Sequence, residues 1–286
     1  AHGGARPSHA VWQGRRYHRG GAVDYLGQHY EDFESATGYG TGAGLCGWNC
    51  RHTFFVVFPE LGSPPAWTQE SLEALNARNI EYDSKLYTRY EISQMQRARE
   101  RAVRKWKRRY LAEDAAGADT TASAVKLRQA RQSLADFTRA TGGRVDSART
   151  SVHGFGRSEG SKASYAARKQ ERFNAANTEL QQMREAGTIK AKGRLIESPS
   201  APNEINFASD HVLQRWAERG MGPMDAERII RSSKVAMSQR NGTQTCYYSE
   251  LGFVAIGQDG NVSSIGPLDE GGKKLMEVVK KHGIPH

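Results

Sequence analysis

Hydrophobic residues recur with a helical period through the middle of the chain. Residues 88–111 place their apolar side chains near one stripe and their basic side chains over the remaining surface, which predicts a long amphipathic helix. A second periodic run covers 121–141 and stops at Gly142-Gly143, and a third helix is predicted over 163–184. The core positions predicted for the first two helices are Ile92, Met95, Ala102, Val103, Trp106, Tyr110, Val125, Leu127, Leu134 and Phe137.

The first 66 residues show no such period and are rich in Gly and aromatic residues. The apolar run at 53–58 predicts a short strand or a buried extended segment. Pro64-Pro65 ends this part of the chain. Thr68 then fits the N-cap of a short helix that ends between 76 and 79.

After residue 205 the pattern changes to short helices and β-rich runs. Pro223 suits the first turn of a helix, and Asp259-Gly260 is a strong hairpin signal. The predicted elements are a helix with Asp210 near its start, a helix at 224–232, β-runs at 244–249, 252–256 and 262–265, and an amphipathic helix at 273–281.

These changes of pattern predict an α+β chain with four parts. The fold class combines an irregular Gly-rich N-terminal part, long basic helices, and a C-terminal module of two helices, a β-meander and a final helix. The parts are a motif region at 1–66, a helical basic region at 67–186, a Ser/Pro/Gly-bearing linker at 187–204 and the small α+β module at 205–286.

Composition limits the class of protein. With 286 residues, 37% of them hydrophobic, and a mean hydropathy of −0.70, we expect elongated helices with much solvated surface. No run approaches the roughly 18 apolar residues of a membrane span, so no membrane partner is expected. Three cysteines cannot all pair with one another, which favours synthesis in a reducing cytoplasm. The absence of an initiator Met leads us to expect a segment of a longer polypeptide.

The net charge of +10 is concentrated away from the C-terminal module. Residues 88–110 hold nine Arg or Lys against two Glu, whereas ten bases face nine acids after residue 205. Two interpretations of the basic helix stay open, namely a solvated helix surface and a face that binds nucleic-acid phosphates without reading bases. The phosphate-binding candidates recur at i, i+4, i+7 and i+11 and are Arg97, Arg101, Arg104 and Arg108.

Two dense motifs carry a family resemblance. Residues 5–14 read Ala-Arg-Pro-Ser-His-Ala-Val-Trp-Gln-Gly, and residues 46–52 read Cys-Gly-Trp-Asn-Cys-Arg-His. Together they resemble the minor capsid proteins of tailed bacteriophages, whose chains pair such segments in this order. The basic pattern at 90–108 and the His-Gly-Phe-Gly-Arg turn at 153–157 continue the resemblance, which covers about residues 1–175.

The resemblance implies a structural role in a phage or prophage head. It implies location in the virion near the portal, with portal or other head proteins as partners, after synthesis in the bacterial cytoplasm. Within the motifs it suggests packing anchors at Trp12, Tyr39 and Trp48. The groups expected to fix the loop by hydrogen bonds are His9, Asn49, Arg51 and His52.

The cysteines and histidines of the motifs form a candidate metal site. Cys46, Cys50 and His52, with His9 as a distant fourth, offer the sulfur and nitrogen ligands that zinc prefers. The Cys-x3-Cys-x-His spacing is not that of a standard zinc finger. A structural turn with buried thiols and a capping His is the favoured interpretation, so no cofactor is expected and structural zinc is the alternative. A catalytic Cys-His pair at Cys46 or Cys50 is less favoured.

The C-terminal module offers a separate candidate active site. His211, Arg215 and Arg219 recur at i, i+4 and i+8, so they share one helix face. An imidazole beside two guanidiniums suits metal-independent RNA cleavage, in which the His moves protons and the Arg pair stabilises the phosphate charge. Hydroxyls of Thr243, Tyr247, Tyr248 or Ser264 are candidates to complete the site from the sheet.

This element order is similar to the small toxin ribonucleases of the barnase, colicin and RelE-like group. That resemblance implies a toxin module and a cognate immunity protein as a partner. The alternative is a plain amphipathic helix, with the core formed by Val212, Trp216, Ile229 and Ile230. The best-supported function is therefore a phage minor capsid protein, and the rivals are a ribonuclease in 205–286 and a DNA-binding module at 88–110.

Overall fold

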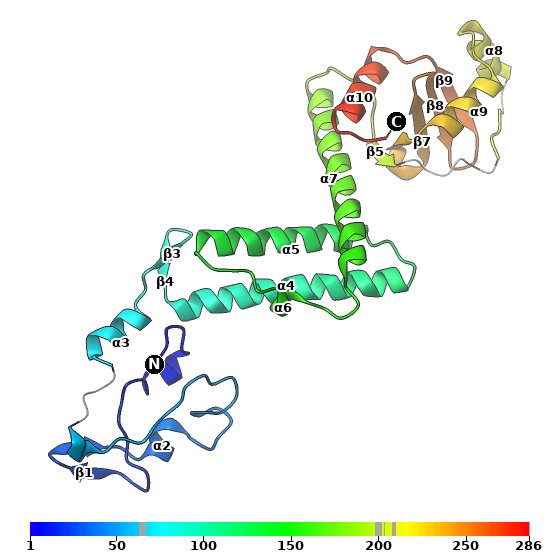
Figure 1. Ribbon diagram of the computed structural model, residues 1–286. Coiled ribbons are helices and arrows are strands. Elements are labelled where there is room, and N and C mark those ends of the chain that lie inside the picture. Colours follow the sequence, from blue (N-terminus) through cyan, green and yellow to red (C-terminus); the bar gives the residue numbers. More distant parts are fainter. Residues whose placement is uncertain (63–66, 198–201, 203, 208–209, 286) are drawn as a thin grey trace. The chain divides into compact units, whose positions relative to one another are not determined.

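The computed structural model describes residues 1–62, 67–197, 202, 204–207 and 210–285, without the side chains of residues 210–212 and 215 (Figure 1). The chain divides into two compact units. The first comprises Ala1–Arg109 and Leu127–Phe155, and the second comprises Tyr110–Lys126 and Gly156–His286. Among the described helices, none combines the length and the apolar character that a bilayer crossing requires.

The first unit consists of short elements followed by two long helices. Its short elements are α1 (Pro7–Ala10), β1 (Val23–Tyr25), β2 (Gln28–Tyr30), α2 (Phe33–Thr37), the 3-10 turn η1 (Pro59–Leu61), α3 (Gln69–Asn76), β3 (Ile80–Tyr82) and β4 (Lys85–Tyr87). β1 pairs with β2 and β3 with β4, each as an isolated antiparallel hairpin. Thr68 caps α3 as the sequence predicts, accepting a hydrogen bond from the Ser71 amide at 3.2 Å.

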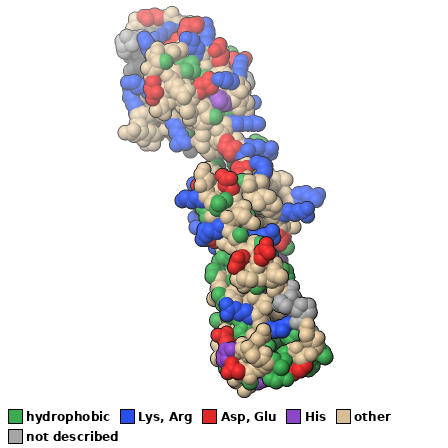
Figure 2. Space-filling view, turned by 90° about the vertical axis from the view of Figure 1, so that its left-hand side faces the viewer, with side chains coloured by type: hydrophobic (Ala, Val, Ile, Leu, Met, Phe, Trp, Pro, Cys, Tyr) green, Lys and Arg blue, Asp and Glu red, His purple; other side chains and the backbone are tan. Residues whose placement is uncertain are grey.

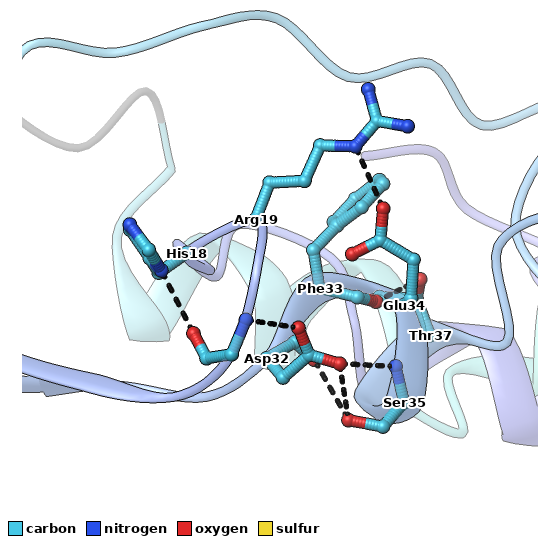
Figure 3. Close-up of polar contacts among 8 residues, drawn as sticks. His18, Arg19, Asp32, Phe33, Glu34, Ser35 and Thr37 are labelled. Carbon is cyan, nitrogen blue, oxygen red and sulfur yellow. Dashed lines mark hydrogen bonds and ion pairs between the residues drawn. The ribbon is translucent and has the colours of Figure 1, made fainter.

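Asp32 connects the loop before β1 to the start of α2 (Figure 3). One carboxylate oxygen accepts the Ser35 amide at 2.8 Å and the Ser35 hydroxyl at 2.6 Å, and the other accepts the Gly21 amide at 2.9 Å. These hydrogen bonds, with those from Ser35 largest, lower the pKa of Asp32 from 3.8 to about 2. Arg19 adds an ion pair to Glu34 at 2.7 Å. A single charged N-cap thus orders the residues around α2.

The long helices α4 (Arg89–Ala115) and α5 (Thr121–Ala140) confirm the helical prediction. The Arg99 guanidinium lies 4.1 Å from the centre of the Phe137 ring, so part of this packing is cation–π in character. Among the predicted core positions, Met95, Ala102, Trp106 and Val125 are half-buried. The buried ones are Ile92, Val103, Tyr110, Leu127, Leu134 and Phe137.

The apolar run at 53–58 is neither a strand nor buried, so that prediction was wrong. It forms no regular element and pairs with no strand of the described chain, since the two hairpins of this unit pair within themselves. The Phe54 ring packs on Phe33, with 4.7 Å between ring centres. Phe55 and Val56 remain 72% and 76% exposed. The unit therefore lacks a second apolar layer that would cover this segment.

The second unit is built on a five-stranded antiparallel sheet with helices on both faces (Figure 1). One face packs against α7 (Arg157–Glu185) and α10 (Glu270–Lys281), and the other against α8 (Asp210–Glu218) and α9 (Pro223–Ser232). This arrangement confirms the α+β class. In spatial order the strands are β5 (Arg194–Glu197), β6 (Val235–Gln239), β7 (Gln244–Ser249), β8 (Gly252–Gly257) and β9 (Val262–Gly266).

The predicted linker at 187–204 needs correction. Its residues Arg194–Glu197 form β5, which pairs with β6 at the edge of the sheet. Leu195 is 2% exposed and packs with Phe173 and Leu180 of α7. The buried apolar side chains of α7 and β5 are therefore part of the core of the sheet. The C-terminal module consequently begins before residue 205. This strand has only four residues and its neighbours include glycine and charged residues, so the alternation of apolar and polar positions was too short to predict a strand.

The acid sensitivity of the Asp32 cap can be tested by substitution. Because its folded pKa lies below its unfolded value, the carboxylate stabilises the fold above about pH 4, and this contribution is lost as the pH falls towards about 2. We expect Asp32→Asn to lower the melting temperature near pH 7 and to differ little from wild type near pH 2. Asp24→Asn, on the exposed Asp24–His29 pair, is the control and should show a much smaller difference. A constant Asp32→Asn difference across this range would contradict the assignment.

The assignment of α7 to the sheet core can be tested on one helix. Leu180 is fully buried and Tyr165 is 64% exposed. We expect Leu180→Ala to lower the free energy of unfolding in urea by about 2–5 kcal/mol through cavity formation. Tyr165→Ala should change it by less than about 0.5 kcal/mol. Hydrogen exchange of the β7 and β8 amides should accelerate in the first variant, and equal effects of both variants would refute the assignment.

Candidate metal centre

The structure brings His9, Cys50 and His52 together. Their potential ligand atoms all lie within 4.8 Å of one another. Cys50 Sγ lies 3.5 Å from His9 Nδ1 and 3.4 Å from His52 Nδ1. His9 comes from α1, and the other two residues follow the Gly-rich loop at 37–47. Three of the four residues proposed from the sequence as metal ligands therefore converge.

Close backbone approach explains the glycines of the loop. A Cβ at Gly44 would collide with the Gly38 carbonyl, and one at Gly47 would be 2.5 Å from the Gly42 oxygen. Two hydrogen bonds close the loop, from the Leu45 amide to the Thr37 carbonyl at 3.0 Å and from the Trp48 amide to the Gly42 carbonyl at 2.7 Å. Only glycine fits where backbone segments touch in this way.

The Ala43 carbonyl fixes which ring nitrogen of His9 faces Cys50. Its Nε2 lies 2.9 Å from the Ala43 carbonyl oxygen and must donate the hydrogen, since a carbonyl only accepts. The other ring nitrogen, Nδ1, faces Cys50, and it carries a lone pair in the tautomer that has its hydrogen on Nε2. The ring is 1% exposed and stacks on Trp12 at 4.2 Å. This is the orientation of a metal-binding histidine whose other nitrogen is held by a carbonyl.

His52 is half-buried in a positively charged environment. Burial, followed by the charges of His2, His9 and Arg6, lowers its pKa from 6.5 to about 4, so the ring is neutral near pH 7. The ring of His2 lies 4.5 Å from that of His52, centre to centre. The Nε2 atoms of both rings are buried without a hydrogen-bond partner in the described structure. His2 had no signal in the sequence, because its spacing to the other ligands follows no motif.

A cavity of about 230 Å³ opens beside the cluster. His9, Cys50 and His52 all line it. Three guanidinium-bearing side chains line it as well, from Arg6, Arg51 and Arg97. The cluster therefore borders a polar, positively charged space rather than a closed apolar core.

Cys46 and Trp48 depart from their predicted roles. Cys46 is exposed, and its Sγ lies 3.6 Å from the His52 carbonyl oxygen, outside the three-residue cluster. The backbone turns at Cys46, where φ is +61°. Trp48 is 77% exposed, so the prediction of a packing anchor was wrong for this residue. Trp12 and Tyr39 do pack, on His9 and Phe33 respectively.

The four arginines predicted to bind phosphate do not form one free surface. Arg97 lines the cavity beside the cluster, and Arg104 donates to the Arg149 carbonyl. Arg101 and Arg108 are exposed. The helical period places all four on one side, but Arg104 is held by the Arg149 carbonyl and Arg97 faces the cavity.

The residues of the predicted ribonuclease site are only partly described. The side chains of His211 and Arg215 lie outside the described residues. Arg219 follows α8 and donates to the Ile265 carbonyl at 2.8 Å. Tyr247 packs in the core beneath α8 and α9, where burial raises its pKa. The plain-core alternative is also visible in part, since Trp216, Ile229 and Ile230 are buried; the side chain of Val212 is outside the described residues.

Tyr247 and Ser264 occupy opposite faces of the sheet. Tyr247 is paired with Val254 and shares its face, beneath α8 and α9. Ser264 is paired with Ala255, which packs on the side of α7 and α10. Because directly paired residues project to the same side, the two hydroxyls do not meet in one site.

Comparison with known proteins finds one family model that matches the N-terminal part. Residues 1–139 match the family described as phage minor capsid protein 2. No curated protein and no solved structure matches the chain. The matched residues contain both N-terminal motifs, the cysteine–histidine cluster and α4. The match therefore supports a phage minor capsid protein, a structural protein that is found in the virion and interacts with other head proteins.

Proposed function

We propose that this chain is an assembly protein of the phage head, located near the portal, and that it docks on the portal or another head protein through an exposed apolar segment. That segment, named here the docking segment, comprises residues 54–61. The single observation that carries the proposal is its exposure within the part of the chain that matches the minor capsid family.

Large apolar side chains dominate the surface of the docking segment. The exposed fractions are 72% for Phe55, 76% for Val56, 59% for Phe58 and 76% for Leu61. Figure 2 shows hydrophobic side chains gathered on the surface of the N-terminal part, at the lower end of the view. Clustered exposure of this kind is uncommon on monomeric proteins and marks interaction surfaces.

The docking segment is held in place by its inward residues. Phe54 packs between Phe33 and Tyr39, with ring centres 4.7 and 5.2 Å apart. Val57 is half-buried. The stretch at 53–58 forms no helix and joins no described strand, so a partner can cover its apolar side chains.

Replacing outward residues of the docking segment should block head assembly. We expect phage carrying Phe55→Asp with Val56→Asp to yield heads that lack this protein, because two buried carboxylates without partners disfavour the interface. The measurement is the amount of the chain in purified heads. Met224→Asp is the control, since Met224 is 78% exposed and Asp suits the first turn of α9. Normal incorporation of the double variant would refute docking through this segment.

A ribonuclease activity of the C-terminal module is the second candidate function. The order of two helices followed by an antiparallel meander supports it, because the resemblance to toxin ribonucleases depended on that order. The opposite placement of Tyr247 and Ser264 counts against the full predicted site. Any activity would depend on His211 with Arg215 or Arg219, and a cognate immunity protein would be its partner. Binding of genome phosphates by Arg101 and Arg108 also stays a prediction.

Incubation of the full chain with total RNA tests the ribonuclease proposal. We expect cleavage in the presence of a metal chelator and its loss in His211→Ala, since the imidazole is the proposed proton carrier. His29→Ala, on the exposed β1–β2 hairpin, should cleave like the wild type. Intact RNA at high protein concentration, or equal cleavage by His211→Ala, would remove this function.

A further inference from the structure

We propose that His9, Cys50 and His52 bind one zinc ion, and that this ion fastens the Gly-rich loop to α1. The inference is independent of the docking proposal, because it uses different residues and concerns the folding of the motif region. The assembly role alone does not explain why the two motifs contain these histidine and cysteine residues. A shared metal site would explain them.

The two sulfur-to-nitrogen distances in the cluster match zinc coordination. With Zn–S near 2.3 Å and Zn–N near 2.0–2.1 Å, a tetrahedral ion separates its sulfur and nitrogen ligands by about 3.5 Å. Cys50 Sγ lies 3.5 Å from His9 Nδ1 and 3.4 Å from His52 Nδ1. These two sulfur-to-nitrogen distances match two edges of a zinc tetrahedron, and all three ligand atoms lie within 4.8 Å of one another.

The orientation of the His9 ring is already suited to a metal. Its Nε2 hydrogen is donated to the Ala43 carbonyl at 2.9 Å, which leaves Nδ1 free to coordinate. Metal-bound histidines commonly use such a carbonyl to fix the ring.

The fourth corner opens to the cavity lined by Arg6, Arg51 and Arg97. Its volume of about 230 Å³ accommodates water as the fourth ligand. Zinc binds cysteine as the thiolate, so Cys50 would release its proton on binding. The nearby guanidiniums oppose the approach of a cation, and the charge of the metal-bound thiolate offsets part of that repulsion.

The ion would stabilise a loop that cannot form a core. The Gly-rich loop at 37–47 contains five glycines, which lose more backbone entropy on ordering than other residues. A metal bound between Cys50, His52 and His9 joins residues 41 positions apart in sequence. Its binding free energy then contributes to folding of the motif region.

Zinc analysis of the full chain with single-cysteine variants tests the proposal. The protein is purified under reducing conditions, loaded with Zn²⁺, freed of excess metal and analysed for zinc per chain. We expect one zinc ion in the wild type and in Cys46→Ser, and none in Cys50→Ser or His52→Ala. Cys46→Ser is the matched control, because Cys46 lies in the same loop but outside the cluster.

Cobalt substitution and circular dichroism separate ligand loss from misfolding. With Co²⁺ as the probe, thiolate-to-metal absorption should appear in the wild type and in Cys46→Ser and be absent from Cys50→Ser, while all three keep the same helical signal. Zinc retained by Cys50→Ser, or lost from Cys46→Ser, would overturn the ligand assignment. A folded wild type that binds neither metal would show that hydrogen bonds alone hold the cluster.

Discussion

The hydrogen bond from His9 to the Ala43 carbonyl joins two motifs that lie 34 residues apart, and the N-terminal unit is organised around it. The net gain from such a bond is about 0.5–1.5 kcal/mol, but leaving the imidazole N–H buried and unpaired would cost about 1–3 kcal/mol. The same bond decides which nitrogen of His9 faces Cys50. It also requires the loop to bring Ala43 up to α1, which the close backbone contacts at Gly44 and Gly47 permit. The Gly-rich composition and the burial of His9 are therefore consequences of one constraint.

The two units differ in how completely they bury their apolar side chains. The second unit alternates the side chains of its strands between two apolar layers, each covered by a pair of helices. The first unit has short hairpins, small helices and α4–α5 packing, and it leaves several large apolar side chains in solvent. A protein that functions within an assembly can leave surface uncovered if a partner covers it later. This difference fits the match to a minor capsid family, which lies within residues 1–139.

Polar contacts near the basic helix limit what its charge can do. Arg104 and Lys107 donate to the carbonyls of Arg149 and Thr150, so these cations hold a loop. Arg97 faces the cavity beside the cysteine–histidine cluster. A count of nine basic residues in 88–110 therefore overstates the charge available to an external phosphate. Arg101 and Arg108 remain exposed on the same helix.

Local pattern by itself determined the helices and most of the C-terminal strands, since period and caps act within a few residues. Thr68 and Pro223 marked helix starts, and Asp259-Gly260 marked the hairpin between β8 and β9. The two N-terminal motifs likewise indicated the family, because each is a contiguous run of residues. Tertiary structure alone decided that β5 belongs to the sheet, that 53–58 stays uncovered, and that Tyr247 and Ser264 face apart. It also decided that Cys50 rather than Cys46 meets His9, because contacts between distant segments depend on how the backbone turns, and that information is spread over the whole unit.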